Sequence, residues 1–182
     1  MLQVELSAYL LFALMLLLIP YRWIGGMILA VTVHELFHMA ALCCCGIQIR
    51  QVRIKAFGVT LETEQMLPRI EALCALAGPV GSFCILLLSN YIPEAAVIGL
   101  CQGLFNMLPF YPLDGGRVIR SLCPKAFCEA AEVFVWIILL AGGFWIWVRW
   151  DMGLSAMVIP VWTMLIMFRR KIPCKERNLA VQ

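Results

Sequence analysis

The chain has 182 residues, of which 63% are hydrophobic and only 14% are Asp, Glu, Lys or Arg. Soluble domains carry charge on about a quarter of their residues, so this composition excludes an ordinary soluble protein and favours a chain embedded in a lipid bilayer. The formal net charge of +3 does not indicate a nucleic-acid partner, because membrane topology alone accounts for the basic residues.

Uncharged apolar stretches follow one another along the chain. A transmembrane helix needs about 20 apolar residues, with roughly 17 to 25 as the working range. We therefore expect an all-α, polytopic membrane protein with about six transmembrane helices, forming a single domain over residues 1–182. The first stretch has no basic region before it, so we expect a retained helix rather than a cleaved signal peptide. The expected helices lie at residues 5–21, 24–46, 70–91, 94–111, 127–148 and 152–168.

The second expected helix contains the sequence His-Glu-Leu-Phe-His at residues 34–38. Residues i and i+4 of a helix lie on one face, so His34 and His38 can bind the same metal ion. Neutral imidazoles suit zinc, and Glu35 can accept a proton from the attacking water. A carboxylate inside a transmembrane helix costs about 2.5 to 3.5 kcal/mol on insertion scales, and such residues usually serve a function. The motif therefore predicts a zinc site rather than two structural histidines.

Residues 47–66 are neither continuously apolar, like the expected helices, nor similar to the basic C-terminal segment after residue 168. Apolar and polar side chains alternate imperfectly up to a turn near Gly58, which predicts a small membrane-associated β-hairpin between the second and third helices. Exposed strand edges cannot lie in lipid, so we expect the segment at the inner membrane surface or against protein. An edge strand there can bind an extended peptide by β-augmentation. The pattern is equally compatible with an amphipathic interfacial loop.

A catalytic zinc ion has three protein ligands, and Asp114 is a candidate for the third. It follows Pro109 and Pro112, which must break the fourth helix, and precedes two glycines that let the backbone pass close to whatever Asp114 binds. In the expected topology the second and fourth helices run in the same direction, so Asp114 belongs to the same half of the membrane as the histidines. Glu129 or Glu132 is the alternative, as in a gluzincin-like membrane protease.

The distribution of basic residues predicts the orientation of the chain. With the N-terminus inside, all 14 Lys and Arg residues except Arg22 and Arg149 lie on the cytoplasmic side, as the positive-inside rule requires. We therefore expect both termini in the cytoplasm. The basic residues after 168 can contact anionic lipid headgroups.

Nine cysteines are present, but no two have the Cys-x-x-Cys spacing. Most of them lie within or beside expected helices, including the run Cys43–Cys45. Reduced thiols in such places act as small hydrophobic side chains. We therefore expect neither a disulfide framework nor a thiolate zinc site.

Two motifs together resemble the site-2 protease family of intramembrane metalloproteases. One is the His-Glu-Leu-Phe-His sequence, and the other is Asn-x-x-Pro-x-x-Pro-Leu-Asp-Gly at residues 106–115. They occur in the family's order, on the second and fourth helices, which is most similar to the bacterial branch typified by stage IV sporulation protein FB. The resemblance covers roughly residues 24–120, which we take as the core of the domain.

The resemblance assigns roles to five residues. It implies that Zn²⁺ is bound by His34, His38 and Asp114 and that Glu35 is the general base and acid. It further implies that Asn106 helps to hold the substrate backbone, for which a cap at the helix break is the alternative interpretation.

Two departures from the family pattern limit what carries over. The family often has an asparagine shortly after a Gly-Pro pair in the third helix, whereas this chain has Ser82 there, so a substrate-clamping role is not implied. We also expect neither a PDZ domain nor a C-terminal nucleotide-sensing domain, which occur in other branches.

The resemblance implies an intramembrane zinc endopeptidase in a bacterial cell membrane. Its expected substrate is a membrane-embedded or membrane-tethered peptide, such as a signalling or sporulation precursor, cut near the cytoplasmic face. The bilayer and regulatory membrane proteins are the other expected partners. A non-catalytic membrane protein that only binds clients is the alternative from another class, and an intact Glu35 argues against it.

Overall fold

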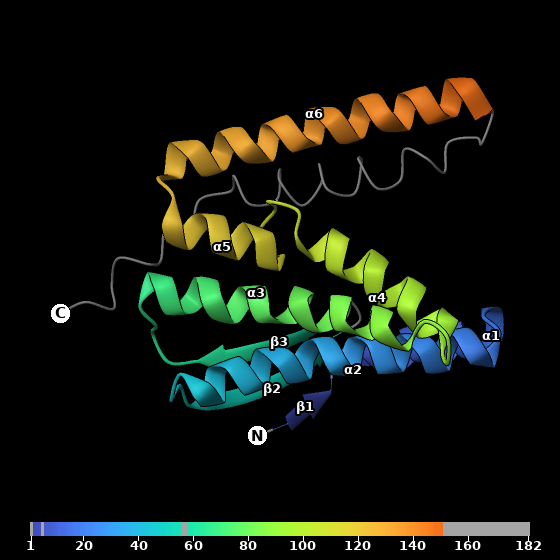
Figure 1. The fold of residues 1–182 in the computed structure, drawn as a ribbon, viewed down its shortest axis with the longest axis horizontal. Coiled ribbons are helices and arrows are strands. Elements are labelled where there is room, and N and C mark those ends of the chain that lie inside the picture. The colour runs from blue at the N-terminus through green and yellow to red at the C-terminus, as the bar shows by residue number, and fades with distance from the viewer. Residues whose placement is uncertain (1, 5, 56–57, 151–182) are drawn as a thin grey trace. The chain divides into compact units, whose positions relative to one another are not determined.

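The computed structural model describes residues 2–4, 6–55 and 58–150. The chain divides into two compact units, Met1–Cys128 and Glu129–Gln182. The sixth expected helix, at residues 152–168, lies outside the described residues. The elements, labelled in Figure 1, are β1 (Leu2–Val4), α1 (Leu6–Leu18), α2 (Tyr21–Cys44), β2 (Ile49–Lys55), β3 (Gly58–Thr63), α3 (Pro68–Cys84), the 3₁₀-helix η1 (Ile85–Leu88), α4 (Pro93–Asn106), α5 (Asp114–Leu122) and α6 (Lys125–Trp150).

Three helical stretches in the described part of the chain are long and apolar enough to cross a membrane: Tyr21–Cys44, Pro68–Leu88 and Lys125–Arg149. A shorter apolar helix covers Tyr9–Leu18, and α4 has 14 residues. Large apolar side chains face outward on several helices, and Leu87, for example, is 82% exposed. Such a surface is typical of helices that lipid covers. The chain is thus mostly helical with three candidate spans, and the count of six spans stays a prediction.

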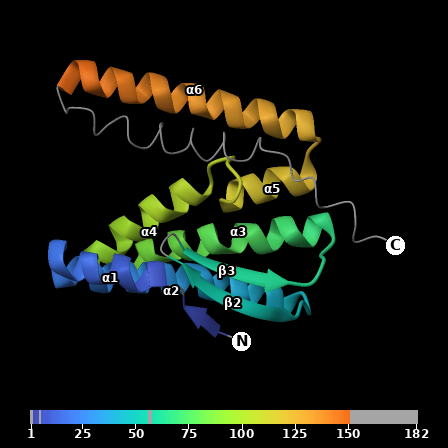
Figure 2. The ribbon, with the colours of Figure 1, turned by 180° about the vertical axis from the view of Figure 1, so that it is seen from behind.

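Residues 49–63, where the sequence pattern predicts a strand pair, contain β2 and β3 in antiparallel pairing, with Ile54 opposite Val59. The short strand β1 adds to β2 in parallel, with Leu2 opposite Val52, and no sequence signal indicated it. The three strands form one sheet in the order β1-β2-β3, seen in Figure 2. Within the described residues β3 pairs only with β2, so it has a free edge.

Helices α2 and α4 pack side by side and run in the same direction. Near their N-terminal ends Arg22 Nε lies 3.3 Å from Glu94 Oε1, and farther along both helices Asn106 Nδ2, at the end of α4, lies 3.3 Å from His34 Nε2 in the middle of α2. Gly26 permits this approach, because a Cβ there would lie 2.9 Å from the Ala95 nitrogen. Small residues at helix contacts are typical of helix packing in membranes. The parallel course agrees with the expected relative direction of these two segments.

The fourth expected helix, 94–111, ends earlier than its apolar pattern suggests. Helix α4 stops at Asn106, and a loop leads to α5, which begins at Asp114. Pro109 and Pro112 explain the break, since neither can continue a helix. Helix α5 packs tightly on the loop before it: a Cβ at Gly115 would overlap the Met107 carbonyl, so only glycine fits there. Asp114 thus lies in the first turn of a helix, where a negative charge is stabilised.

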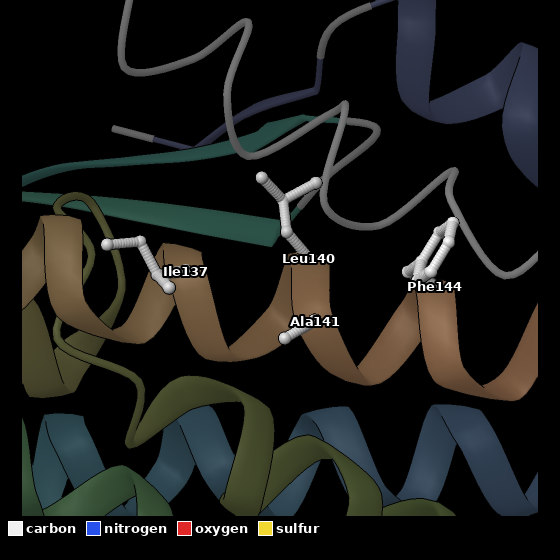
Figure 3. Close-up of a pocket in the computed structure, with 4 residues that line it drawn as sticks. All are labelled: Ile137, Leu140, Ala141 and Phe144. Atoms are coloured by element: carbon white, nitrogen blue, oxygen red, sulfur yellow. The ribbon is translucent and has the colours of Figure 1, made fainter.

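Helix α6 begins in the first unit and continues through the second. Four of its residues line a hollow of about 410 Å³: Ile137, Leu140, Ala141 and Phe144, drawn in Figure 3. Their spacing places them on one face of the helix. All four side chains are apolar, so they offer no metal ligand and no acid or base. His34, Glu35, His38, Asn106 and Asp114 lie in the first unit, whereas the alternative ligands Glu129 and Glu132 lie in the second.

Candidate metal site

His34, His38 and Asp114 lie together, and each is at most 7% exposed. The Nε2 atoms of the two imidazoles are 3.2 Å apart. Asp114 Oδ2 lies 3.2 Å from His34 Nε2 and 3.3 Å from His38 Nε2. Among the described residues, these three form the group of His, Cys, Asp and Glu side chains that could hold a metal ion. One turn of α2 and the first turn of α5 thus aim three ligand atoms at one point.

The other ring nitrogens are bonded to α3. His34 Nδ1 lies 2.8 Å from Ser82 Oγ, and His38 Nδ1 lies 2.8 Å from the carbonyl oxygen of Cys74. Since the later histidine meets the earlier residue of α3, the two helices run antiparallel here. Partners on Nδ1 fix ring orientation and favour Nε2 as the ligand atom, the arrangement usual for histidines that bind metals.

The donor set fits zinc. The Cys74 carbonyl can only accept, so His38 Nδ1 carries the hydrogen and the neutral ring keeps a lone pair on Nε2. That lone pair faces Asp114 Oδ2 at 3.3 Å, and two acceptors this close repel each other unless a proton or a cation lies between them. Two imidazole nitrogens and one carboxylate oxygen are a ligand set that zinc takes at sites with an open fourth position.

Asp114 has the charge that a metal ligand needs. Burial raises the pKa of its carboxyl, but the hydrogen bonds between this carboxyl and the rings of His34 and His38 outweigh burial, so the pKa lies below its ordinary value. The carboxylate is therefore ionised at neutral pH and can bind a divalent cation.

Gly78 on α3 packs directly against the two imidazoles. A Cβ at this position would overlap His38 Nε2 and would lie 2.8 Å from His34 Cε1. The neighbouring Gly81 holds Phe37 of α2 in the same way, with its Cβ position 2.7 Å from Cδ2 of the ring. The absence of side chains here lets α3 lie close enough for Ser82 and Cys74 to reach the histidines.

Glu35 and Asn106, the other residues that the family resemblance singled out, lie at this cluster. Glu35 interacts electrostatically with both histidines, with Asp114 and with Arg117. The half-buried Asn106 directs its side-chain nitrogen to His34 Nε2. The structure therefore brings all five predicted site residues into one region.

Three residues of the site were not predicted from the sequence: Ser82 as the partner of His34, the Cys74 carbonyl as the partner of His38, and Gly78 as the surface against which both rings pack. The pairs are 48 and 36 residues apart in the chain. The available signal was the cluster of small residues around Pro79 on α3, which is typical of a close helix contact.

No protein-family model matches the chain. A Synechocystis protein whose name assigns it to the zinc metalloproteases is 33% identical over 122 residues, covering 55% of this chain and 32% of the relative. A protein of Methanocaldococcus jannaschii named as a zinc metalloprotease is 26% identical over 112 residues, covering 54% of this chain and 33% of the relative. The chain thus spans about a third of the length of these relatives.

The chain has the fold of a solved site-2 protease from Methanocaldococcus jannaschii. The TM-score is 0.59 at 17% sequence identity, and the match covers 90% of this chain and 87% of that chain. At this identity the likeness concerns the fold alone. The chain is therefore similar to zinc metalloproteases in sequence over about half its length and to a site-2 protease in fold.

Proposed function

We propose that this chain is an intramembrane zinc endopeptidase of the site-2 protease family, within the branch typified by stage IV sporulation protein FB. The observation that carries the proposal is the convergence of His34, His38 and Asp114 beside α2 and α3, two helical stretches with the length and composition of membrane spans. The similarity to zinc metalloproteases and the fold of a site-2 protease support it.

His34, His38 and Asp114 would hold the zinc ion through two Nε2 atoms and one carboxylate oxygen. When bound, zinc polarises the carbonyl of the scissile peptide and makes water a better nucleophile at neutral pH. The three protein ligands leave a fourth position for this chemistry. Their burial keeps bulk water away, which strengthens every electrostatic interaction in the site.

Glu35 is the proposed general base and acid. It follows His34 on α2 and lies in the electrostatic range of both imidazoles and Asp114. From there its carboxylate accepts a proton from the attacking water and later donates it to the departing amide nitrogen. Arg117 also interacts electrostatically with Glu35.

Asn106 is proposed to hold the substrate backbone. Its side-chain nitrogen lies 3.3 Å from His34 Nε2, so an amide donor stands beside the reacting centre. A role as a helix cap would instead direct the side chain to the backbone of α4 or of the loop after it. The contact with His34 therefore favours the substrate-binding role.

The proposed substrate is a membrane-embedded or membrane-tethered peptide, such as a signalling or sporulation precursor. A helix in lipid satisfies its own backbone, so the segment to be cut must unwind before its carbonyl can be attacked. The free edge of β3 can receive such an extended segment through main-chain hydrogen bonds. We propose cleavage near the cytoplasmic face of a bacterial cell membrane, by a chain that has six spans and both termini in the cytoplasm. Other membrane proteins would regulate it.

Replacing Glu35 by glutamine tests the proposal. We expect Glu35→Gln to keep stoichiometric zinc while peptide cleavage falls by about 10²- to 10⁴-fold, the usual contribution of a general base. The measurement uses the full chain in lipid vesicles with a panel of single-span substrates, followed by gel electrophoresis. Glu94→Gln is the matched control, because it removes the same charge in the first turn of α4, whereas the site lies at the other end of that helix, beside Asn106. This variant should cleave as wild type.

Two results would contradict the proposal. Undiminished cleavage by Glu35→Gln would remove Glu35 from the reaction. A zinc-loaded wild-type chain that binds members of the panel and cuts none of them would favour the non-catalytic, client-binding alternative.

A further inference from the structure

Ser82 is a completely buried polar residue on α3, with no exposed surface. Its Oγ lies 2.8 Å from His34 Nδ1, on the side of the imidazole away from Asp114. A buried hydroxyl without a hydrogen bond destabilises a folded protein. The hydrogen bond with His34 gives both the buried hydroxyl and the Nδ1 atom of the ring a partner.

The surrounding helices fix the position of Ser82. Gly99 of α4 packs on its backbone, since a Cβ at Gly99 would lie 2.9 Å from the Ser82 carbonyl oxygen. On the other side, Gly81 and Gly78 hold α3 against the side chains of α2. The hydroxyl is therefore held at one place relative to His34 by three packed helices.

The two histidines differ in how their hydrogens are placed. His38 faces a backbone carbonyl, which can only accept, so its Nδ1 must donate. His34 faces a hydroxyl, which can donate or accept, so its Nε2 is free to bind a metal only while Ser82 acts as the acceptor. The orientation of His38 thus depends on the backbone carbonyl of Cys74, and the orientation of His34 depends on the side chain of Ser82.

We propose that Ser82 is a positioning residue of the metal site: its Oγ accepts the Nδ1 hydrogen of His34 and thereby directs the Nε2 lone pair toward the ion. The inference rests on the proposed function, because it requires zinc at His34, His38 and Asp114. It assigns to Ser82 a task in metal binding rather than in holding substrate. Partners of this kind usually change metal affinity by about 10- to 100-fold.

The test compares Ser82→Ala and Ser82→Cys with the wild-type chain. The dissociation constant for Zn²⁺ is measured in detergent by competition with a chromophoric chelator, and the visible spectrum of the Co²⁺-loaded chain reports ligand geometry. We expect both variants to bind Zn²⁺ about 10- to 100-fold more weakly and to show altered Co²⁺ spectra. Cysteine nearly preserves the volume of serine but is a much weaker acceptor, and its sulfur lies across the ring from the ion.

A purely structural role predicts a different result. If Ser82 only fills space, Ser82→Cys binds Zn²⁺ with the wild-type constant and spectrum, and this outcome overturns the inference even where Ser82→Ala fails to fold. Ser89→Ala is the matched control, because Ser89 is exposed and its substitution should leave the constant unchanged. A wild-type chain that binds no Zn²⁺ would instead refute the proposed function itself.

Discussion

The variant Asp114→Ala is expected to lose bound zinc and peptide cleavage together. The carboxylate is the one anionic ligand of the buried cluster, with Oδ2 within 3.3 Å of both imidazoles. Residues that merely support a ligand change metal affinity by about 10- to 100-fold, so loss of a ligand should weaken zinc binding by more than about 100-fold. Zinc per chain after dialysis, measured by mass spectrometry, and cleavage in vesicles check this result.

Asp114→Asn refines the experiment. It keeps the shape of the side chain and removes the negative charge, so it should bind zinc more weakly than wild type and more strongly than Asp114→Ala. Retention of stoichiometric zinc by Asp114→Ala would favour the gluzincin-like alternative, with Glu129 or Glu132 as the third ligand. Adding Glu129→Gln or Glu132→Gln singly to Asp114→Ala would then identify the ligand.

Gly78→Ala is expected to disrupt the site although it adds a single methyl group. The new Cβ would overlap His38 Nε2 and crowd His34, so α3 must shift away or the rings must turn. Overpacking of this kind usually costs about 1 to 3 kcal/mol of stability. A displacement of about 1 Å at a reacting centre costs roughly 100-fold in rate, so we expect cleavage to fall at least that far, with weaker zinc binding.

Gly25→Ala is the matched control for Gly78→Ala. Gly25 lies on α2, as the histidines do, and a Cβ there meets nothing within 4 Å. Alanine favours a helix over glycine by about 1 kcal/mol, so this variant should fold and cleave normally. A Gly78→Ala chain with wild-type zinc affinity and cleavage would show that the two rings do not pack as described.

The parts of the site that lie within one helix or one loop could be predicted from the sequence. His34 and His38 are one turn apart, and their shared face follows from helix geometry. Asp114 could be singled out because prolines and glycines mark a broken helix around it. These are local signals, and each needs only a few neighbouring residues.

The hydrogen bonds that orient the two histidines could not be predicted from the sequence, because they join distant segments of the chain. Nothing near His34 in the chain indicates that Ser82 bonds its ring, and nothing near His38 indicates the Cys74 carbonyl. The same holds for β1, whose three residues form a strand only because β2 lies beside them. Helix α5 was also missed, since its proline-rich approach indicated a break but not the helix that follows.

The ligand shell of bound zinc tests the central claim most directly. X-ray absorption at the zinc edge, recorded on the full chain with one equivalent of Zn²⁺, should show nitrogen and oxygen ligands at about 2.0 to 2.2 Å, including two imidazoles. It should show no sulfur at about 2.3 Å, although the chain has nine cysteines. A sulfur shell, or an ion bound by fewer than two imidazoles, would contradict a site made of His34, His38 and Asp114.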